Sequence, residues 1–463
     1  MVELTPNPSY SLTVRCQIPN KAGMLANIVN AVASVGGSLG QIDSIEQNHN
    51  IAIREITVNA SSTEHADRIV DAIKTLPEIK LVDVYDRTFD LHRGGKIRID
   101  SKLSLKRQDD LAMAYTPGVG RICRAIAEEP ELVHTLTIKS NTVAIVTDGS
   151  AVLGLGNLGP EAAMPVMEGK AMLFKEFAGV DAFPVCLDTQ DVDEIVETVC
   201  RIAPVFGGVN LEDIAAPRCF EIERRLRERL DIPVFHDDQH GTAIVTLAAL
   251  FNALRVVSKD LSAAKIVING AGAAGVAIAC LLEKAGAGKI VMCDSKGILS
   301  ETRTDLNDQK RQFACDETGA LADAVRGADI FIGVSAPGVL TKEMVLSMAD
   351  KPIVMAMANP IPEIQPELIQ GNAAVIATGR SDYPNQINNV LAFPGIFRGA
   401  LDCRAVDLTT NMYLEAASAI ASLLSPTQVA SDNIVPSVFD ERVVVAVAAA
   451  VQRAARQEGV ARC

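Results

Sequence analysis

The sequence predicts an α/β protein in which a small N-terminal unit precedes a larger body built on parallel strands. Two observations support this prediction. Over residues 9–88, strand-like and helix-like segments follow the order βαββαβ, which is that of the ferredoxin-like split unit. From residue 142 onward, apolar strand-like segments alternate with helices, a pattern typical of a parallel sheet that binds ligands at the carboxyl ends of its strands. A chain of 463 residues is long enough for several such domains.

The composition excludes several classes of protein. The chain is 48% hydrophobic and 22% charged, as expected of a globular protein. Its net charge of −14 argues against a nucleic-acid partner, because nothing supplies a basic stripe. The ten cysteines lack close pairing, which favours free thiols in a reducing compartment. No secretory signal is recognisable, and the longest apolar run, residues 443–451, is far below the roughly 18 residues that a membrane span needs. We therefore expect a cytoplasmic protein without a membrane partner.

The N-terminal unit contains six expected elements. Residues 11–18 alternate like a strand, and residues 24–35 form an amphipathic helix that ends at Gly36. Strand-like runs follow at 39–47 and 51–58, then a helix at 63–75 and a last strand at 79–85. Residues 18–25, Ile-Pro-Asn-Lys-Ala-Gly-Met-Leu, resemble the ligand loop of ACT domains, which bind amino acids or other small effectors. The resemblance implies that Asn20 and Gly23 contact an effector. A unit that only assembles subunits is the alternative.

Residues 88–102 are expected to link this unit to the body, where a tyrosine and a lysine are candidates for proton transfer. Tyr115 precedes a Thr-Pro-Gly turn, and Lys170 is expected to begin an otherwise apolar helix. Burial and the field of a helix start would lower the pKa of that amine toward the range of a general base. Lys175 lies about 140° around the same helix, so only one of the two lysines can face a given cleft. The alternative for Tyr115 and Lys170 is ordinary packing, with the polar tips hydrogen-bonded or in water.

Two acidic pairs suggest a metal site. Glu212-Asp213 follows the expected strand at 206–211, and Asp237-Asp238 follows the strand at 232–235 and precedes an apolar helix. Carboxylates at neighbouring strand ends can converge on one hard divalent cation, Mg²⁺ or Mn²⁺. Helix capping with solvated charge is the alternative. A zinc site from His236 and His240 is also conceivable, but the dense carboxylates favour a hard metal.

The strongest local motif predicts a Rossmann dinucleotide site. An expected strand at 264–269 leads into Gly270-Ala271-Gly272-Ala273-Ala274-Gly275 and a helix, and the next strand ends at Asp294. The glycines, the helix start and the acidic residue for a ribose hydroxyl form the complete fingerprint. Asp294 favours NAD because it repels a 2′-phosphate. Ser295 and Lys296 beside it could accept that phosphate, so NADP stays open.

Three more strands are expected at 328–335, 353–360 and 374–379, and their polar ends could line a nicotinamide cleft. Asn388 and Asn389 precede an apolar turn at 390–394, where asparagines are typical turn formers. The tail is expected to form two helices, at 407–424 and 440–456, that pack on the body or on a neighbouring subunit.

Together, the motifs resemble those of malic enzymes of the compact bacterial type. The likeness covers about residues 90–455, in the order of the family. The motifs are Tyr115-Thr116-Pro117-Gly118, Thr147-Asp148-Gly149-Ser150, Gly154-Leu155-Gly156-Asn157-Leu158-Gly159, Glu168-Gly169-Lys170, Glu212-Asp213, Phe235-His236-Asp237-Asp238-Gln239-His240-Gly241-Thr242, Gly270-Ala271-Gly272, Asn359-Pro360 and Asn388-Asn389. The resemblance implies oxidative decarboxylation of L-malate to pyruvate and CO₂, with reduction of NAD or NADP, Mg²⁺ or Mn²⁺ as cofactor, and a homodimer or larger homo-oligomer. It also implies a substrate and metal domain at 89–255, a Rossmann domain at 256–400 and packing helices at 401–463, and the separate ACT resemblance implies an ACT-like domain at 1–88.

The resemblance also implies roles for single residues. Tyr115 is the general acid, Lys170 the general base, and Asp237 supports the network between the lysine and the metal. Glu212, Asp213 and Asp238 hold the metal. The expected dinucleotide contacts are Gly270, Gly272, Ala273, Ala274, Gly275, Asp294 and Asn359, and the expected substrate contacts are Asn359, Asn388 and Asn389. One departure is that Ser150-Ala151 stands where larger malic enzymes carry an arginine for the substrate carboxylate.

Two other functions fit parts of the pattern. A dehydrogenase of a hydroxy or amino acid with an ACT domain shares the Rossmann motif but works without metal. A nucleotide-sensing regulator with a decayed site would lack at least one of Tyr115, Lys170 and the carboxylates, and all of them are present.

Overall fold

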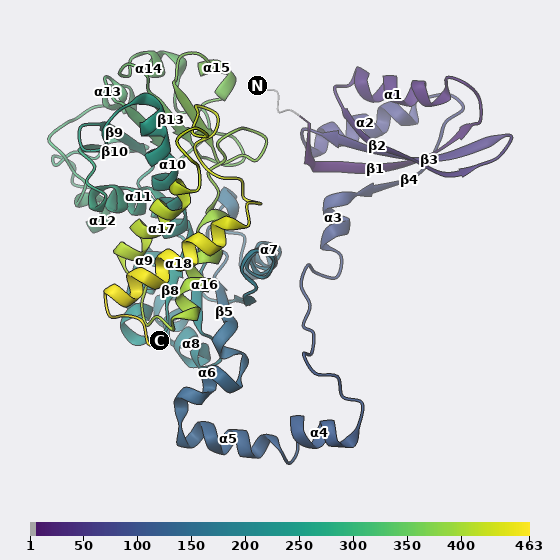
Figure 1. Ribbon diagram of the computed structural model, residues 1–463. Coiled ribbons are helices and arrows are strands. Elements are labelled where there is room, and N and C mark those ends of the chain that lie inside the picture. The colour runs from purple at the N-terminus through teal and green to yellow at the C-terminus, as the bar shows by residue number, and fades with distance from the viewer. Residues whose placement is uncertain (1–5) are drawn as a thin grey trace. The chain divides into compact units, whose positions relative to one another are not determined.

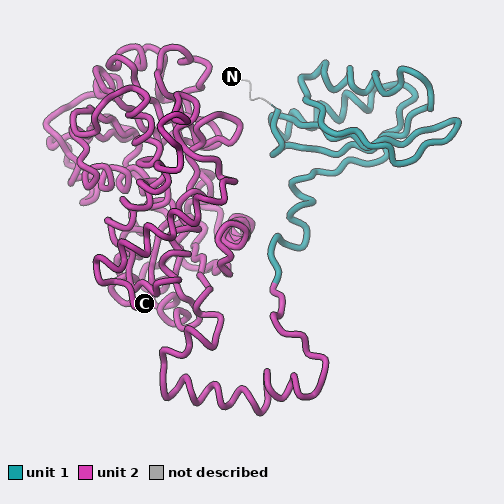
Figure 2. Tube along the Cα trace, viewed as in Figure 1, with its two compact units in different colours: residues 1–98 teal, residues 99–463 magenta. Residues whose placement is uncertain are grey.

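The structure is a computed structural model that describes residues 6–463. It divides the chain into two compact units, Met1–Arg98 and Ile99–Cys463 (Figure 1, Figure 2). Each unit has its own hydrophobic core, so we describe the two separately.

The smaller unit is an antiparallel sheet with two helices on one face. Its elements are β1 (Asn7–Pro19), α1 (Met24–Ser34), β2 (Ser38–Gln47), β3 (Ile51–Ala60), α2 (Thr63–Lys74) and β4 (Lys80–Asp86). The strand order is β2-β3-β1-β4, and Val14 at the centre of β1 pairs with Ile56 on one side and Val84 on the other. Val14 and Ile56 pack in one core with Ile28 of α1 and Ile69 of α2. The order of elements is the one that the sequence predicts.

The expected linker begins with a short helix. α3 (Arg87–His92) starts directly after β4 because the Asp86 carboxylate accepts hydrogen bonds from the backbone N–H groups of Thr88 and Phe89.

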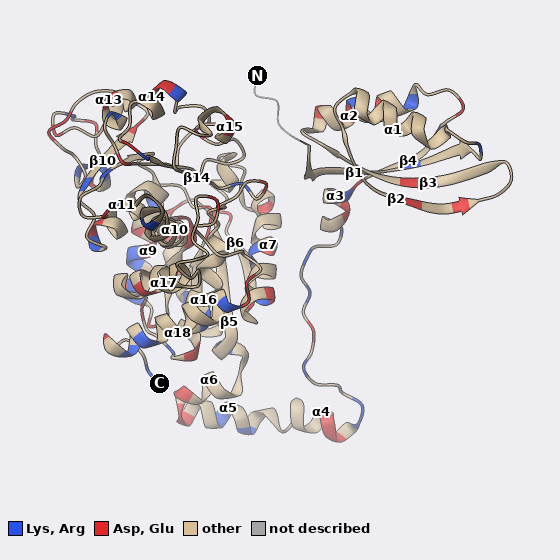
Figure 3. Ribbon diagram, turned by 45° about the horizontal axis from the view of Figure 1, so that its top comes forward, with Lys and Arg blue, Asp and Glu red and all other residues tan. Residues whose placement is uncertain are grey.

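The larger unit begins with an arm of two helices, α4 (Gln108–Ala114) and α5 (Val119–Glu128). Neither helix has a buried residue, and both lie at the edge of the unit in Figures 1 and 3. Short helical turns then lead into the body: η1 (Pro130–Leu132), α6 (Val133–Leu136) and η2 (Ile138–Asn141).

The first sheet of the body is parallel and has helices on both faces. Its strands lie in the order β6 (Asp181–Cys186), β5 (Thr142–Thr147), β7 (Gly208–Leu211) and β8 (Val234–His236). The covering helices are α7 (Pro160–Ala178), α8 (Val192–Ile202), α9 (Arg218–Arg229) and α10 (Thr242–Val257). Side chains alternate along β5, so Val143 and Ile145 pack with α7 and α10 while Ala144 and Val146 pack with α8 and α9.

The second sheet is of the Rossmann type. Its strand order is β11 (Gly297–Ile298), β10 (Lys289–Asp294), β9 (Lys265–Asn269), β12 (Ile330–Gly333), β13 (Ile353–Ala356) and β14 (Val375–Thr378). All neighbours are parallel except β10 and β11. The remaining helices of this half are α11 (Ala273–Lys284), α12 (Asp308–Arg311), α13 (Leu321–Val325), α14 (Lys342–Leu346) and α15 (Pro366–Ile369).

The C-terminal part adds η6 (Asn389–Leu391), α16 (Phe393–Asp402), α17 (Thr410–Ser422) and α18 (Arg442–Gln457). Both expected tail helices are present, but the apolar turn that the sequence predicts at 390–394 runs into a helix that it does not predict, α16, which begins at Phe393. Phe393, Ile396 and Phe397 point into the core of the body. Their i, i+3, i+4 spacing is typical of a helix. The asparagines directly before them are turn formers, and this is why the sequence predicts a turn here.

A second correction concerns Lys170. The sequence predicts that this residue begins its helix, whereas α7 starts at Pro160, with proline at a position that favours a helix start. Lys170 therefore lies in the interior of α7, so the field of a helix start does not act on it.

One long apolar helical run, Asp237–Val257, has the length and composition of a membrane span, yet most of it is buried inside the protein, as in a core helix. Acidic and basic residues are interspersed along the ribbon of the larger unit (Figure 3).

Candidate active site

The first sheet brings a buried lysine against two carboxylates. Lys170 projects from α7, Glu212 follows β7, and Asp237 follows β8. The Lys170 Nζ atom lies 2.5 Å from Asp237 Oδ2 and 2.9 Å from Glu212 Oε1. The lysine is only 9% exposed, and its ammonium lies over the ring of Phe393 at 4.3 Å. Three chain segments therefore meet where parallel strands end, as the sequence predicts.

The charge state of Lys170 differs from the expectation. Burial lowers the pKa of the amine, but the negative charges of Asp237 and Glu212 outweigh this effect and raise the pKa above its ordinary value. In the protein without a bound cation, the lysine is therefore a firmly held ammonium ion and not a poised base.

The expected metal ligands come together. One oxygen each of Glu212, Asp213 and Asp238 lie within 4.8 Å of one another. Asp213 has a φ of +54°, a left-handed conformation that is strained for most residues, and its N–H donates to Asp238 Oδ2 at 2.9 Å. Asn210, which the sequence analysis did not single out, donates from Nδ2 to Glu212 Oε2 at 2.8 Å. These bonds fix the direction of the carboxylates.

These ligands fit a hard divalent cation. Asp213 Oδ2 and Asp237 Oδ1 are buried oxygens without a hydrogen-bond partner in the described chain, and buried acceptors of this kind are costly unless something binds them. An all-oxygen set suits Mg²⁺ or Mn²⁺. The zinc alternative is not favoured, because His240 Nε2 pairs with Glu223 Oε1 at 2.7 Å and so the two histidines do not converge.

Asp237 is held from two sides. Asn389 Nδ2 donates to Asp237 Oδ2 at 3.0 Å, so the structure brings this predicted substrate residue to the cluster. On the other side, a Cβ added to Gly241 would lie 1.9 Å from Asp237 Oδ1. Only glycine at position 241 leaves this carboxylate in place.

The glycine-rich loop has the geometry of a dinucleotide site. Gly270 has a φ of +120°, and a Cβ there would lie 2.4 Å from the backbone oxygen of Val334. A Cβ on Gly275 would lie 1.7 Å from Gly270 O, so this glycine permits the close packing of α11 on β9. Ala273 and Ala274 form the first turn of α11. Beside the loop lies a cavity of about 750 Å³ whose lining includes Gly270, Gly272 and Asp294.

Asp294 carries partners that the sequence analysis did not foresee. Its carboxylate forms ion pairs with Arg303 and Lys310, and this pairing, against the opposing effect of burial, lowers the pKa of Asp294. No local motif marks Arg303 or Lys310, because Arg303 lies in the irregular segment after β11 and Lys310 lies in the single short turn of α12.

The remaining predicted residues lie outside the lysine cluster. Tyr115 is 67% exposed on the arm, and the described chain does not place it near Lys170. Asn359 is exposed beyond β13, and the Asn388 side chain accepts from Val390 N–H in η6. Lys175 pairs with Asp181 at 2.7 Å, which confirms that it faces away from Lys170. The proposed roles of Tyr115, Asn359 and Asn388 stay predictions.

The loop of the smaller unit is ordered by its own side chains. Asn20 Nδ2 donates to Asn48 O at 2.6 Å, and Gln47 Nε2 donates to Asn20 Oδ1 at 3.2 Å. Gly23 has a φ of +88° at the start of α1, where a left-handed conformation favours glycine.

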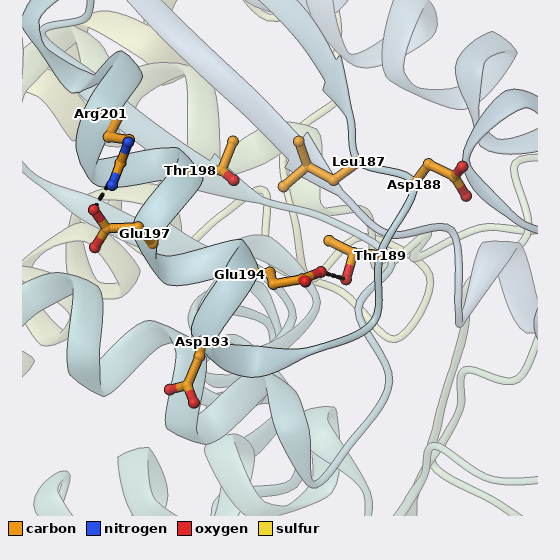
Figure 4. Close-up of a pocket in the computed structure, with 8 residues that line it drawn as sticks. All are labelled: Leu187, Asp188, Thr189, Asp193, Glu194, Glu197, Thr198 and Arg201. Carbon is orange, nitrogen blue, oxygen red and sulfur yellow. Dashed lines mark hydrogen bonds and ion pairs between the residues drawn. The ribbon is translucent and has the colours of Figure 1, made fainter.

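A surface depression near β6 and α8 is separate from this cluster (Figure 4). Two pairs form within it, Arg201 with Glu197 and Thr189 with Glu194, and it contains none of the predicted site residues.

Comparisons with known proteins agree with this geometry. Residues 94–227 match the model of the malic enzyme N-terminal domain, and residues 239–456 match the model of the malic enzyme NAD-binding domain. The chain is 55% identical over 459 residues to an NAD-dependent malic enzyme of Geobacillus stearothermophilus, which covers 98% of this chain and 96% of that one. It is 49% identical to an NADP-dependent malic enzyme of Escherichia coli over 79% of this chain and 51% of that one. The crystal structure of an NAD-dependent malic enzyme from Thermotoga maritima matches with a TM-score of 0.76 and 47% identity, over 80% of this chain and 99% of that one.

The carboxylate cluster predicts a pH-dependent stability. Burial, followed by the charge of Asp238, raises the pKa of Asp213 from 3.8 to about 7. The folded state then binds a proton that the unfolded state has lost, so this group stabilises the cation-free fold below about pH 4 and loses that contribution as the pH rises to about 7. With a chelator present, the midpoint of thermal unfolding should fall between pH 5 and pH 8 by more in the parent than in Asp213→Asn, in which the side chain does not titrate. Added Mn²⁺ should remove the difference at pH 8, because the cation replaces the proton. Equal slopes in the two proteins would contradict this assignment.

Proposed function

This chain belongs to the malic enzyme family, and we propose on that premise how its own residues carry out the reaction. It is an oxidoreductase that converts L-malate to pyruvate and CO₂ and passes the hydride to NAD or NADP. The observation that supports the assignment of residues is the buried contact of Lys170 with Asp237 and Glu212, next to the carboxylates of Asp213 and Asp238. The alternative of a metal-independent dehydrogenase is not favoured.

Lys170 acts as the general base. It takes the proton of the C2 hydroxyl while the hydride on C2 leaves for the nicotinamide ring. Asp237 holds the ammonium that results, and Asn389 keeps Asp237 in position. In the second step the bond between C3 and the C4 carboxylate breaks, and its electrons pass toward the C2 carbonyl. Tyr115 then supplies the proton that C3 of the enolpyruvate needs.

Glu212, Asp213 and Asp238 would hold Mg²⁺ or Mn²⁺. When bound, such a cation supplies positive charge that stabilises negative charge on the substrate oxygens and lowers the pKa of a neighbouring ammonium. The unpartnered oxygen Asp213 Oδ2 supports this assignment.

Replacement of Lys170 tests the assignment of the base. In Lys170→Ala, malate-dependent reduction of NAD or NADP at 340 nm, with Mn²⁺, should fall by about a hundredfold to ten-thousandfold, because Lys170 is the only amine of the described residues that pairs with Asp237 and Glu212. Affinity for the dinucleotide, measured by fluorescence titration with the reduced form, should stay unchanged. Lys175→Ala is the matched control, because this lysine of the same helix points to Asp181. Loss of dinucleotide affinity in Lys170→Ala would count against a role as base, and turnover of the parent unaffected by chelator would count against the metal.

The second element of the proposal is a homodimer in which the arm of α4 and α5 packs on a second copy. Exposed apolar side chains gather on this arm and on the segment before it: Leu103, Leu105, Leu111, Met113, Tyr115, Val119 and Ile122. Side chains of this kind on one segment favour a protein–protein contact. Because Tyr115 lies on the same arm and not beside Lys170, we propose that it reaches the site of the partner subunit.

Subunit complementation tests this arrangement. Tyr115→Phe and Lys170→Ala should each be inactive alone. After the two are mixed and allowed to exchange subunits, hybrid dimers contain one site with both side chains intact, so about a quarter of the parent activity should return. As the matched control, we expect a mixture of Tyr115→Phe with Tyr115→Ala to stay inactive, provided that Tyr115→Ala keeps the fold of the parent. No recovery in exchanged hybrids would contradict a shared site, and a monomer by light scattering would contradict the dimer itself.

The third element is an ACT-like role for the smaller unit, with an effector at Asn20 and Gly23. Three features support it: the βαββαβ order of elements, the position of Gly23 at the start of α1, and the hydrogen bond from the Asn20 side chain to Asn48.

We also propose a cytoplasmic location, which the ten free cysteines support.

A screen of the twenty common L-amino acids tests the effector site. At least one should shift the midpoint of thermal unfolding of the full chain, and Asn20→Ala should remove the shift while Asn27→Ala, on the exposed face of α1, retains it. Absence of any shift would exclude amino acids as the effector class.

A further inference from the structure

A buried glutamate on α9 contacts the turn that carries two of the site carboxylates. Glu223 is only 6% exposed. Its Oε1 atom lies 2.7 Å from His240 Nε2, and its Oε2 atom accepts a hydrogen bond from Gln239 Nε2 at 3.3 Å. The ion pairs of Lys170 and the proposed metal ligands do not include Glu223, so they do not account for a carboxylate buried at this position.

The turn Asp237–Gly241 divides its side chains between two partners. Its first two residues face the cluster, because Asp237 Oδ2 lies 2.5 Å from Lys170 Nζ and Asp238 Oδ2 accepts from Asp213 N–H at 2.9 Å. Its next two residues bind the glutamate of α9. The turn has the wide π-helical conformation, which is rare and occurs mostly at functional sites. Contacts on both sides therefore determine where the first two carboxylates lie.

His240 is fixed by packing as well as by its contact with Glu223. Its ring stacks on Tyr413 of α17 with centroids 4.8 Å apart, and it lies 5.7 Å from the ring of Phe235 in β8. Both of these aromatic side chains are buried. Because α9, α17 and β8 meet at this imidazole, it anchors the turn to three elements of the body.

The alternative is that Glu223 only stabilises the fold. The tight fit of the turn favours a role at the site instead. A Cβ on Gly241 would lie 1.9 Å from Asp237 Oδ1, so even a small displacement of this backbone changes the position of the carboxylate. That oxygen is buried and has no hydrogen-bond partner in the described chain, so no contact of its own opposes such a displacement.

We propose that Glu223 is a positioning residue of the proposed cation site. It holds Gln239 and His240, and through the backbone of the turn it directs the carboxylates of Asp237 and Asp238 toward the cluster. The inference rests on the proposed function, since it concerns the carboxylates of that same site.

Binding of Mn²⁺ alone tests the proposal. The affinity is measured from the electron paramagnetic resonance signal of free Mn²⁺, without malate or dinucleotide. Groups that orient metal ligands typically contribute tenfold or more to metal affinity, so Glu223→Ala should weaken Mn²⁺ binding by about tenfold. Glu223→Gln keeps the shape and an acceptor oxygen, so its affinity should stay within about threefold of the parent. Glu228→Ala is the matched control and should leave the affinity unchanged, because this residue is exposed on the same helix and pairs with Arg224.

Hydrogen exchange of the protein with chelator gives a readout that needs no metal. Loss of the hydrogen bonds to a buried carboxylate should make the amides of residues 237–241 exchange about tenfold faster in Glu223→Ala. The amides of β9 should keep their rates, and so should both segments in Glu228→Ala. If Glu223→Ala does not fold, His240→Phe is the second variant. It keeps a ring on Tyr413 but removes the contact with Glu223, and it should weaken Mn²⁺ binding in the same direction.

The outcomes separate this inference from the proposal on which it rests. A parent that binds no Mn²⁺ and turns over malate in the presence of chelator contradicts the proposed cation site. A folded Glu223→Ala that binds Mn²⁺ as tightly as the parent contradicts the positioning role alone, and with faster exchange throughout the chain it would make Glu223 a residue that stabilises the fold. A loss in Glu223→Gln as large as in Glu223→Ala would assign the effect to charge and would overturn the proposal.

Discussion

The larger unit depends on one buried ionic contact, that of Lys170 with Asp237 and Glu212. A charge removed from water is costly unless opposite charges compensate it, and here a lysine that is 9% exposed meets two buried carboxylates. The contact needs three segments that lie 42 and 25 residues apart in the chain to converge. The parallel order β5-β7-β8 brings Glu212 and Asp237 to one edge, because strands that run in one direction deliver their following residues there. The helix after β5, α7, places Lys170 beside them. The proposed metal ligands Glu212, Asp213 and Asp238 share that edge, so the same topology positions the proposed base and the proposed cation site.

The sequence allowed most of this architecture to be predicted, for an identifiable reason. The strands of both body sheets are short apolar runs, each followed by a polar or glycine-rich turn, and this pattern is local. The acidic pairs lie directly after such runs, so their convergence followed from the parallel topology alone. The fingerprint from Gly270 to Gly275 was likewise readable, because each glycine answers a steric demand within a few residues of chain.

The predictions that failed or stayed incomplete concern non-local effects. The pKa of Lys170 depends on the net effect of burial and two carboxylates from other strands, and no sequence pattern gives that sign. Asp294 was interpreted as a free acid because its partners Arg303 and Lys310 lie in an irregular segment and in a four-residue helix, neither of which has a recognisable periodicity. α16 was missed because Asn388 and Asn389 signal a turn, while the burial that stabilises the helix comes from α7 and α18. The spacing of residues along the chain does not predict where Tyr115 lies relative to Lys170.

The turn Asp237–Gly241 has a consequence for how the two halves of the body communicate. It runs without a break into the buried helix α10, and it also packs against α11, the helix that opens on the dinucleotide loop. A rigid, close-packed interior transmits a shift of α11 to Asp237 and Asp238 instead of absorbing it. Linkage is reciprocal, so any free energy by which the coenzyme strengthens cation binding must appear again, in equal amount, as a gain in coenzyme affinity when the cation is present. In the structure, the contact of this turn with α11 is the direct path by which such a linkage would pass between the two sites.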